Sequence, residues 1–263
     1  MKRRVIFGAG YAGSRAAAAA VALGDEVIAT VRSEKRAAAL EASGFVVTRA
    51  PVLEVAERDV TEHTHAIICF PPDGETDTRL APMLAKARAV TYLSTTGVYG
   101  EARGVIDDAT PVTATPSASM ARVLQAEAAY RAIGATVLRS PGIYGPDRGL
   151  HVRVASGNHR IPGDGSGFIS RIHADDLASF LLASDAVRGE TFVVGDDVPT
   201  RQRDLVAWIC MEYGCPFPPS VPEEEVHETL RRDRRVDARR ARQVLGVTLR
   251  FPSFRDGMRR RPQ

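Results

Sequence analysis

Three glycines near the start of the chain have the spacing of a dinucleotide-binding turn. Gly8, Gly10 and Gly13 form a G-x-G-x-x-G pattern between the apolar run VIF and an alanine-rich stretch. In such a turn the first glycine makes the bend, the second lets a pyrophosphate approach the backbone, and the third lets the helix pack closely on the strand. The helix then directs free backbone N–H groups at the phosphates. The pattern predicts a cofactor site that includes Tyr11 and Ala12, and the alternative is a merely tight strand-to-helix turn.

The end of the next apolar run, EVIATVRSEKR, bears on which nicotinamide cofactor binds. An acidic residue at this position hydrogen-bonds the ribose 2′-hydroxyl of NAD and repels the 2′-phosphate of NADP. The chain has Arg32 and Ser33 there, and a guanidinium beside a hydroxyl favours phosphate, with Lys35 or Arg36 adding positive potential. We therefore expect NADP in preference to NAD. In the alternative, Glu34 binds the ribose and Arg32 is a solvated residue at a helix start.

The framework that positions these residues is predicted by alternating strand-like and helical stretches. Runs such as IICF are apolar without polar alternation, as in parallel strands that are covered by helices on both faces. We expect an α/β fold with a Rossmann-type, doubly wound parallel sheet of six or seven strands. The expected strands cover residues 4–8, 26–31, 45–48, 65–70, 89–95 and 135–139, and the expected helices cover 11–23, 33–43, 76–88, 117–132, 175–184 and 201–213.

The second half of the chain has a different organisation. After PGIYGPDRG the alternation gives way to glycine- and proline-rich segments such as IPGDGSG. We expect a dinucleotide-binding domain over residues 1–145 and mainly a small C-terminal substrate lobe over 146–263, with segments around 170–195 returning to the first domain. The proline-rich segment 214–225 should be an extended surface connection. The arginine-rich run 231–242 should be one solvated face of a helix.

Composition narrows the class of protein. The chain has 263 residues, 44 % of them hydrophobic and 25 % charged, with a net charge of +3, which suits a globular protein. No apolar run approaches the roughly 18 residues of a membrane helix. The N-terminal stretch superficially resembles a signal peptide, but Arg15 interrupts it and the glycine pattern explains it better. Because Cys69, Cys210 and Cys215 lack metal-ligand spacing, we expect reduced thiols, a cytoplasmic location and no metal site.

Four motifs occur along the chain in the order GAGYAG, STTGVYG, RSPGIYGP and SRIHADDLA. They resemble those of extended short-chain dehydrogenases/reductases, and most closely the short, atypical members of the NAD-dependent epimerase/dehydratase group. The resemblance spans nearly the whole chain. It implies a Rossmann domain with a small C-terminal substrate lobe, and it does not specify a reaction.

The resemblance also implies roles for individual residues. Thr95 matches the catalytic serine or threonine of the family, and its neighbour Ser94 is a cofactor contact or a stand-in for it. In SRIHADDLA, His173 and Asp176 match positions that are more often structural than catalytic. The segments expected along the cofactor are Phe70, Pro71 and Pro72 and, beside the nicotinamide, Pro141, Gly142 and Ile143, with simple loop formation as the alternative.

The acid/base pair that is usual in the family is absent. That pair is a tyrosine with a lysine four residues later, and a phenol with a pKa near 10 needs the cation to act near neutrality. No tyrosine of this chain has lysine four residues later. On the helix that should carry the pair, alignment on Glu127 puts Ser119 and Val123 at the two positions, while alignment of Arg122 with the lysine puts Ala118 at the tyrosine. Neither alignment supplies a base.

Three functions remain open at this point. The first is an NADP-dependent oxidoreductase or epimerase acting on a small polar or sugar-like substrate, with Tyr99, Tyr144 or His173 as the displaced acid or base. The second is a non-catalytic NADP-binding sensor or regulator. A third, weaker hypothesis makes the arginine-rich segment a nucleic-acid surface. We expect a small-molecule substrate, a monomer or homodimer, and neither a membrane nor nucleic acid as partner.

Overall fold

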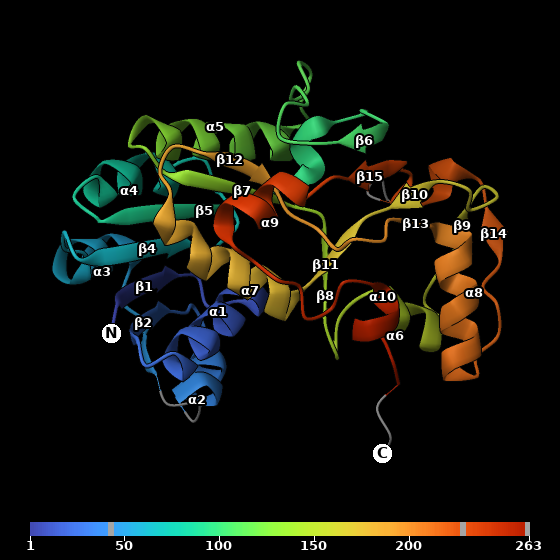
Figure 1. Cartoon of the computed structure of the whole chain (residues 1–263), viewed down its shortest axis with the longest axis horizontal. Helices are drawn as coiled ribbons and strands as arrows, with labels where there is room; N and C mark the ends of the chain where they lie inside the picture. Colours follow the sequence, from blue (N-terminus) through green and yellow to red (C-terminus); the bar gives the residue numbers. More distant parts are fainter. Residues whose placement is uncertain (42–44, 227–229, 261–263) are drawn as a thin grey trace.

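Seven parallel strands form the central sheet in the order β12-β7-β5-β4-β1-β2-β3 (Figure 1). The computed structural model describes residues 1–41, 45–226 and 230–260. The order reverses between β1 and β4, so the carboxyl ends of these strands open a crevice of the kind in which doubly wound folds bind ligands. The strands are β1 (Arg3–Phe7), β2 (Glu26–Thr30), β3 (Val46–Thr48), β4 (Thr64–Ile68), β5 (Ala89–Thr95), β7 (Thr136–Ser140) and β12 (Thr191–Val193).

Helices cover both faces of this sheet because successive strand residues point to opposite sides. Along β1, Ile6 belongs to one hydrophobic core, and Val5 and Phe7 belong to the other. Figure 1 shows the two helical layers on either side of the strands. One layer contains α1 (Tyr11–Ala22), α2 (Glu34–Glu41) and α7 (Ala174–Ala183), and the other contains α3 (Val52–Asp59), α4 (Thr76–Leu84) and α5 (Ala118–Ala132).

A smaller lobe, at the right of Figure 1, lies beyond the carboxyl ends of β5 and β7. Its hydrophobic core includes Leu205, Ile209 and Phe254. Its helices are α6 (Leu150–Ala155), α8 (Gln202–Tyr213) and α10 (Phe254–Gly257). Short strand pairs lie within this lobe or between it and the central sheet: β8 (Gly142–Tyr144) with β11 (Arg171–His173), β9 (Ile161–Pro162) with β14 (Ser220–Val221), β10 (Phe168–Ile169) with β13 (Thr200–Arg201), and β6 (Gly104–Ile106) with β15 (Arg234–Val236).

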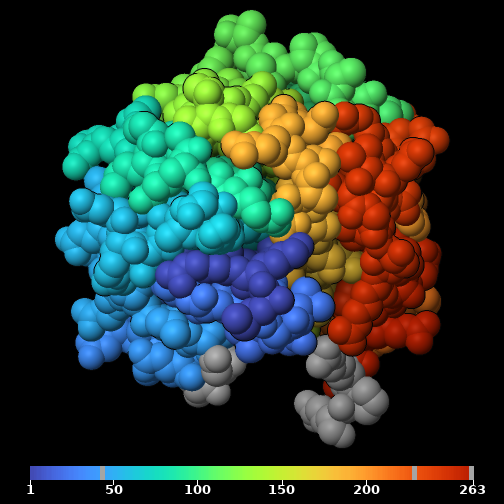
Figure 2. Space-filling view, turned by 60° about the vertical axis from the view of Figure 1, so that its left-hand side comes forward, coloured from blue at the N-terminus to red at the C-terminus, as the bar shows by residue number. Residues whose placement is uncertain are grey.

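Part of the C-terminal half packs on the sheet domain. Strand β12 pairs with β7 at the sheet edge, and α7 packs along α1. In Figure 2 the gold segment around α7 lies between the blue amino-terminal and the red carboxyl-terminal segments of the surface. The residue at which one domain ends and the other begins stays a prediction. Within the described ranges every helix is too short or too polar to span a bilayer.

The arginine-rich run 231–242 is not one helical face, so that prediction was wrong. Residues Arg234–Val236 form β15, and helix α9 (Arg239–Leu245) begins only afterwards. Arg234 is buried, with its guanidinium hydrogen-bonded to the carbonyl oxygens of Thr96, Gly100 and Ala102. Strand pairing with β6 and these inward bonds override the helical pattern of the local sequence.

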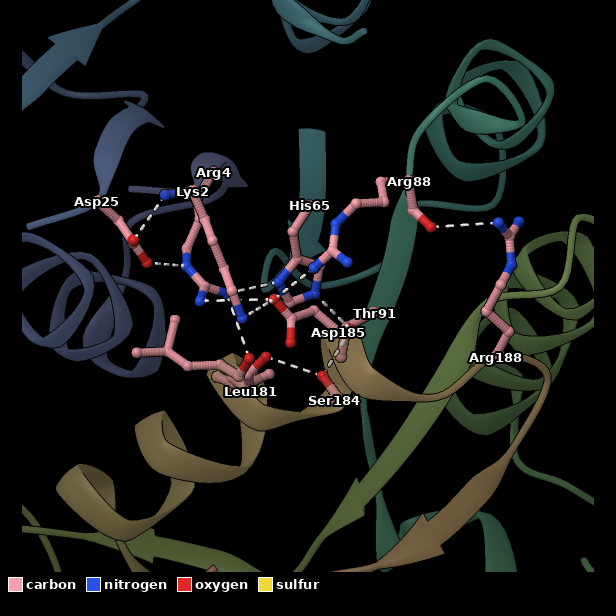
Figure 3. A network of polar contacts seen from close by, with 11 residues as sticks. Lys2, Arg4, Asp25, His65, Arg88, Thr91, Leu181, Ser184, Asp185 and Arg188 are labelled. Carbon is pink, nitrogen blue, oxygen red and sulfur yellow. Dashed lines mark hydrogen bonds and ion pairs between the residues drawn. The ribbon is translucent and has the colours of Figure 1, made fainter. Parts of the chain in front are cut away.

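A buried polar network, shown in Figure 3, lies near the amino ends of β1, β4 and β5. The glycine-rich turn follows the carboxyl end of β1, so the network is at the opposite end of the strands. The His65 ring lies 2.7 Å from Arg4 Nη1 and 2.8 Å from Thr91 Oγ1. Asp185, in the turn η2 (Ser184–Ala186) after α7, accepts from Lys2 at 2.8 Å. Burial lowers the pKa of His65 well below its usual value, and the neighbouring cations lower it further. The network therefore ties α7 to the sheet with His65 neutral.

Candidate functional site

The glycine-rich turn has the geometry that a bound pyrophosphate requires. Gly8 has a φ of +91°, and a Cβ there would lie 2.8 Å from the Phe70 backbone nitrogen. A Cβ at Gly13 would overlap the carbonyl oxygen of Gly8, so this position allows α1 to pack on β1. By contrast, nothing lies within 4 Å of a Cβ built at Gly10. Helix α1 also begins without a side-chain cap, so its first N–H groups face an open space in which an anion can bind.

A cavity of about 850 Å³ extends from this turn along the ends of β2, β3 and β4. We call it the cofactor cavity. Ala12 and Gly13 are buried behind the turn, and Pro72 is outside the cavity lining. The predicted cofactor residues that do line it are Gly8, Gly10, Tyr11, Arg32, Ser33, Phe70 and Pro71.

The cofactor cavity is positively charged at the ends of β2 and β3. Arg32, Arg36 and Arg49 line it, and among the described residues no aspartate or glutamate does. Arg36 donates to the carbonyl oxygens of Ala9 at 3.2 Å and Gly10 at 2.9 Å, so it braces the glycine-rich turn. Arg49 was missed in the sequence, and it joins the cavity because β3 pairs with β2 in the sheet.

Glu34 is the residue considered as an alternative for binding the ribose. It lies outside the lining of the cofactor cavity and forms an exposed ion pair of 3.3 Å with Arg49. Arg32 makes no hydrogen bond or ion pair with any described residue, so its guanidinium is available to a ligand.

A second cavity, of about 680 Å³, lies between the sheet and the C-terminal lobe. We call it the substrate cavity. Its lining includes Thr95 from the end of β5, the segment Pro141–Ile143 and Tyr144. Arg148 lines both cavities, so the loop that carries it separates one cavity from the other.

Thr95 and Ser94 face different surroundings because they are neighbours on a strand. Thr95 lines the substrate cavity, and its Oγ1 accepts from Gly97 N at 3.0 Å. Ser94 is buried, lines neither cavity and donates to Glu127 Oε1 at 2.6 Å. Glu127 also binds the Arg139 guanidinium, which holds the pKa of this buried carboxyl below its usual value although burial raises it. The geometry thus favours Thr95 as the reactive-site hydroxyl, and a cofactor contact by Ser94 stays a prediction.

Of the three candidate replacement acids or bases, only Tyr144 lines the substrate cavity. Tyr99 is buried elsewhere, with its hydroxyl bonded to Asp107 O and to Arg139 Nη1 at 3.2 Å each. His173 Nδ1 accepts from Asp175 N at 3.1 Å and caps α7. The Tyr144 hydroxyl lies 3.4 Å from a backbone carbonyl, and burial raises its pKa far above the usual value. Tyr144 is therefore a neutral hydrogen-bond donor near pH 7.

Helix α5 supplies no substitute for the missing pair. Ala118, Ser119 and Arg122 are exposed, and Val123 packs in a hydrophobic cluster with Tyr99. No residue of this helix lines either cavity. Within the described ranges no group of three or more histidines, cysteines and acidic residues is arranged to hold a metal ion.

Comparison with known proteins places this geometry in a family. No family model and no curated protein matches the chain. A solved structure from Silicibacter pomeroyi DSS, described as a functionally unknown conserved protein, is 31 % identical, with a TM-score of 0.84 over 98 % of this chain and 97 % of that chain. One from Methylobacillus flagellatus, named for the NAD-dependent epimerase/dehydratase group, is 26 % identical, with a TM-score of 0.77 over 98 % and 96 %.

The chain belongs to the extended short-chain dehydrogenase/reductase superfamily. This finding confirms the superfamily assignment that was made from the four motifs. The prediction of a Rossmann-type fold is confirmed as well. The human epimerase family protein SDR39U1 (isoform 2), solved with NADPH, is also similar, at 18 % identity and a TM-score of 0.75 over 97 % of each chain. At that identity the likeness shows the fold alone. The described lining of each cavity of this chain contains arginines, and no tyrosine of the chain has lysine four residues later.

Proposed function

We propose that this protein binds NADP(H) and acts as an oxidoreductase or epimerase on a small polar or sugar-like substrate. The observation that carries the proposal is that two cavities adjoin at Arg148, one with a dinucleotide-binding turn and one with Thr95. The NADPH in the SDR39U1 structure and the fold shared with that protein support a nicotinamide cofactor. We further propose a cytoplasmic location, because the three cysteines are unpaired.

The residues present fit a dinucleotide phosphate. The open space at Gly10 and the uncapped start of α1 would receive the pyrophosphate. Arg32, Ser33 and Arg49 would bind the 2′-phosphate, since guanidinium groups form strong charge-assisted bonds with phosphate. When bound, the cofactor supplies or accepts the hydride.

The protein's own contribution in the substrate cavity is to orient the substrate and to hold a proton near its oxygen. Thr95 Oγ1 would hydrogen-bond the substrate oxygen at the carbon that exchanges hydride. Tyr144 would stay protonated and donate only a hydrogen bond, because its phenol is buried. The remaining proton would pass to or from water, and such a reaction should be slow because positioned acid/base help contributes about 10² to 10⁴-fold.

A non-catalytic NADP-binding sensor is the second candidate function. It is favoured by one specific observation, namely that α5 contributes no side chain to either cavity. A sensor would bind NADPH tightly and never turn it over.

One experiment separates the two candidates. NADPH deuterated at one face of C4 is incubated with the protein and a panel of small aldehydes, ketones and keto sugars, and deuterium in the product is measured by mass spectrometry. Stereospecific transfer to any member supports the enzyme. Tight NADPH binding without transfer across the panel supports the sensor, and an absence of NADPH binding refutes both.

A further inference from the structure

Arginines outnumber acidic residues in the described part of the substrate-cavity lining. Asp147 is the one acidic residue among these described lining residues, and it accepts a hydrogen bond from Tyr11 at 2.8 Å. Five arginines line the same cavity: Arg148, Arg153, Arg171, Arg232 and Arg234. Two of these arginines, Arg171 and Arg234, are buried.

Arg171 has unused hydrogen-bonding capacity at the cavity. Only 4 % of its surface is exposed, and its Nη2 donates to Ile169 O at 3.0 Å. Its Nη1 is buried without a hydrogen-bond partner, and its guanidinium lies 5.3 Å from the ring centre of Phe254. Asp196 is near enough to interact with it electrostatically, yet the two form no ion pair in the described structure, and both carboxylate oxygens of Asp196 lack hydrogen-bond partners.

Arg234 is buried beside the carboxyl end of β5. Its guanidinium donates to Thr96 O at 2.7 Å, to Ala102 O at 2.8 Å and to Gly100 O. These carbonyls accept from three of its five N–H donors and do not neutralise its charge. No carboxylate of the described residues forms an ion pair with it.

A buried guanidinium that forms no ion pair is unfavourable, and Arg171 and Arg234 are two such groups on one cavity among the described residues. A ligand that brings negative charge would relieve both. We propose that the substrate carries an anionic group, a carboxylate or a phosphate, that binds in the substrate cavity at Arg171 and Arg234. This inference rests on the proposed function, because it names the substrate class of the same site. Since Arg234 binds the peptide group next to Thr95, the anion would direct the rest of the substrate toward that hydroxyl.

The test measures anion binding without turnover. The protein is first saturated with NADP⁺, so that phosphate-binding groups of the cofactor cavity are occupied, and is then titrated at low ionic strength with sodium phosphate and, separately, sodium malonate. Calorimetry gives the heat of binding. The fluorescence of the single tryptophan, Trp208, gives a second signal, because its ring lies 5.1 Å from that of Phe254, over which Arg171 lies.

Saturable binding of one anion per chain is expected, with phosphate alone indicating a phosphorylated substrate and malonate alone a carboxylated one. Arg171→Gln and Arg234→Gln should each weaken binding at least tenfold. Arg203→Gln is the matched control, since Arg203 is an exposed arginine of the same lobe outside the cavity lining, and it should bind the anion as the unmutated protein does.

A variant of an exposed arginine at the rim of the cavity keeps the test informative if the variants of the buried arginines misfold. Arg153 is exposed, so Arg153→Gln should fold normally and weaken anion binding several-fold. The proposal is overturned if neither anion binds saturably, or if binding is indifferent to the changes at Arg171, Arg234 and Arg153. Failure of NADP⁺ to bind in the first step would count against the proposed function instead.

Discussion

The Tyr11 hydroxyl donates a hydrogen bond of 2.8 Å to Asp147, which joins the first turn of α1 to the loop between β8 and α6. The Arg148 guanidinium lies 5.0 Å from the centre of the Tyr11 ring, and a Cβ at Gly145 would collide with the Tyr11 hydroxyl. Burial and the Asp147 carboxylate raise the pKa of Tyr11 to about 12, so it remains a donor at neutral pH. The contact holds the loop that separates the cofactor cavity from the substrate cavity.

Removing this contact should weaken cofactor binding without unfolding the protein. Tyr11→Phe keeps the ring and loses the hydroxyl, and a partly exposed hydrogen bond contributes about 0.5 to 1.5 kcal/mol. We expect NADPH to bind roughly 2- to 12-fold more weakly. The affinity is measured by fluorescence titration, and an unchanged value would show that the loop is held by other contacts.

Gly10 and Gly13 belong to the same G-x-G-x-x-G pattern but should respond differently to substitution. Gly10→Val places its side chain in open space, so the fold should persist while the pyrophosphate is excluded. Gly13→Ala forces a Cβ onto the Gly8 carbonyl oxygen and should lower the free energy of unfolding by about 1 to 3 kcal/mol. Thermal unfolding and NADPH titration of both variants check this contrast. Full NADPH affinity in Gly10→Val would mean that the turn is structural only.

Thr95 should matter for turnover and not for cofactor affinity. With a substrate in hand, Thr95→Ala should lower kcat by about 10²-fold, the usual effect of removing one donor at a reacting oxygen. The hydroxyl also caps the turn η1 (Thr96–Tyr99), so a modest loss of stability is expected as well. Thr95→Ser retains the hydroxyl, so its kcat and its stability should both be close to those of the unmutated protein. A fast reaction in Thr95→Ala would place the chemistry elsewhere.

Protein stability should fall as the pH drops below about 6.5, the unperturbed pKa of histidine. Burial lowers the pKa of His65, so the folded protein holds it neutral while the unfolded chain protonates it. The unfolded state then binds more protons, which lowers the free energy of unfolding by at most about 2 kcal/mol between pH 7.5 and pH 5. Urea unfolding of the unmutated protein and of His65→Gln measures the difference. His63→Gln is the control, because His63 is exposed, and an equal pH dependence in His65→Gln would contradict this account.

The central sheet and its glycine-rich turn could be predicted because their signals are local. Parallel strands that are buried on both faces read as apolar runs, and β5 occupies the expected residues 89–95. Helix α5 ends at Ala132, as its sequence pattern predicts, and begins one residue after the expected start, because Ser117 serves as its N-cap. Helix α3 was not predicted, since its eight residues carry only a short amphipathic signal.

The charged residues of the two cavities could not be predicted in the same way, because tertiary pairing brings them together. Arg49 joins the cofactor cavity through the pairing of β3 with β2, and Arg234 turns inward because β15 pairs with β6. The residues next to each arginine in the sequence do not indicate which strand its own strand will pair with. Tyr99, which the sequence offered as a candidate acid or base, is directed to Arg139 by packing that the local sequence does not encode.

Arg32 is the residue whose change should most affect the choice of cofactor. Arg32→Ala should narrow the difference in binding free energy between NADPH and NADH by roughly 1 to 3 kcal/mol, as expected for loss of a charge-assisted contact. Arg49→Ala should have a smaller effect in the same direction, because Arg49 also pairs with Glu34. Lys35→Ala is the matched control, since Lys35 lies outside the cavity lining. An effect of Lys35→Ala as large as that of Arg32→Ala would indicate only a diffuse charge effect.

The most direct test of the account is the affinity of the unmutated protein for the two reduced cofactors. NADPH and NADH are titrated under identical salt conditions, and binding is followed by energy transfer from Trp208 to the nicotinamide. We expect NADPH to bind at least tenfold more tightly, because Arg32 and Arg49 would meet its 2′-phosphate and no carboxylate among the described residues lines the cofactor cavity. Equal affinities, or tighter binding of NADH, would contradict it.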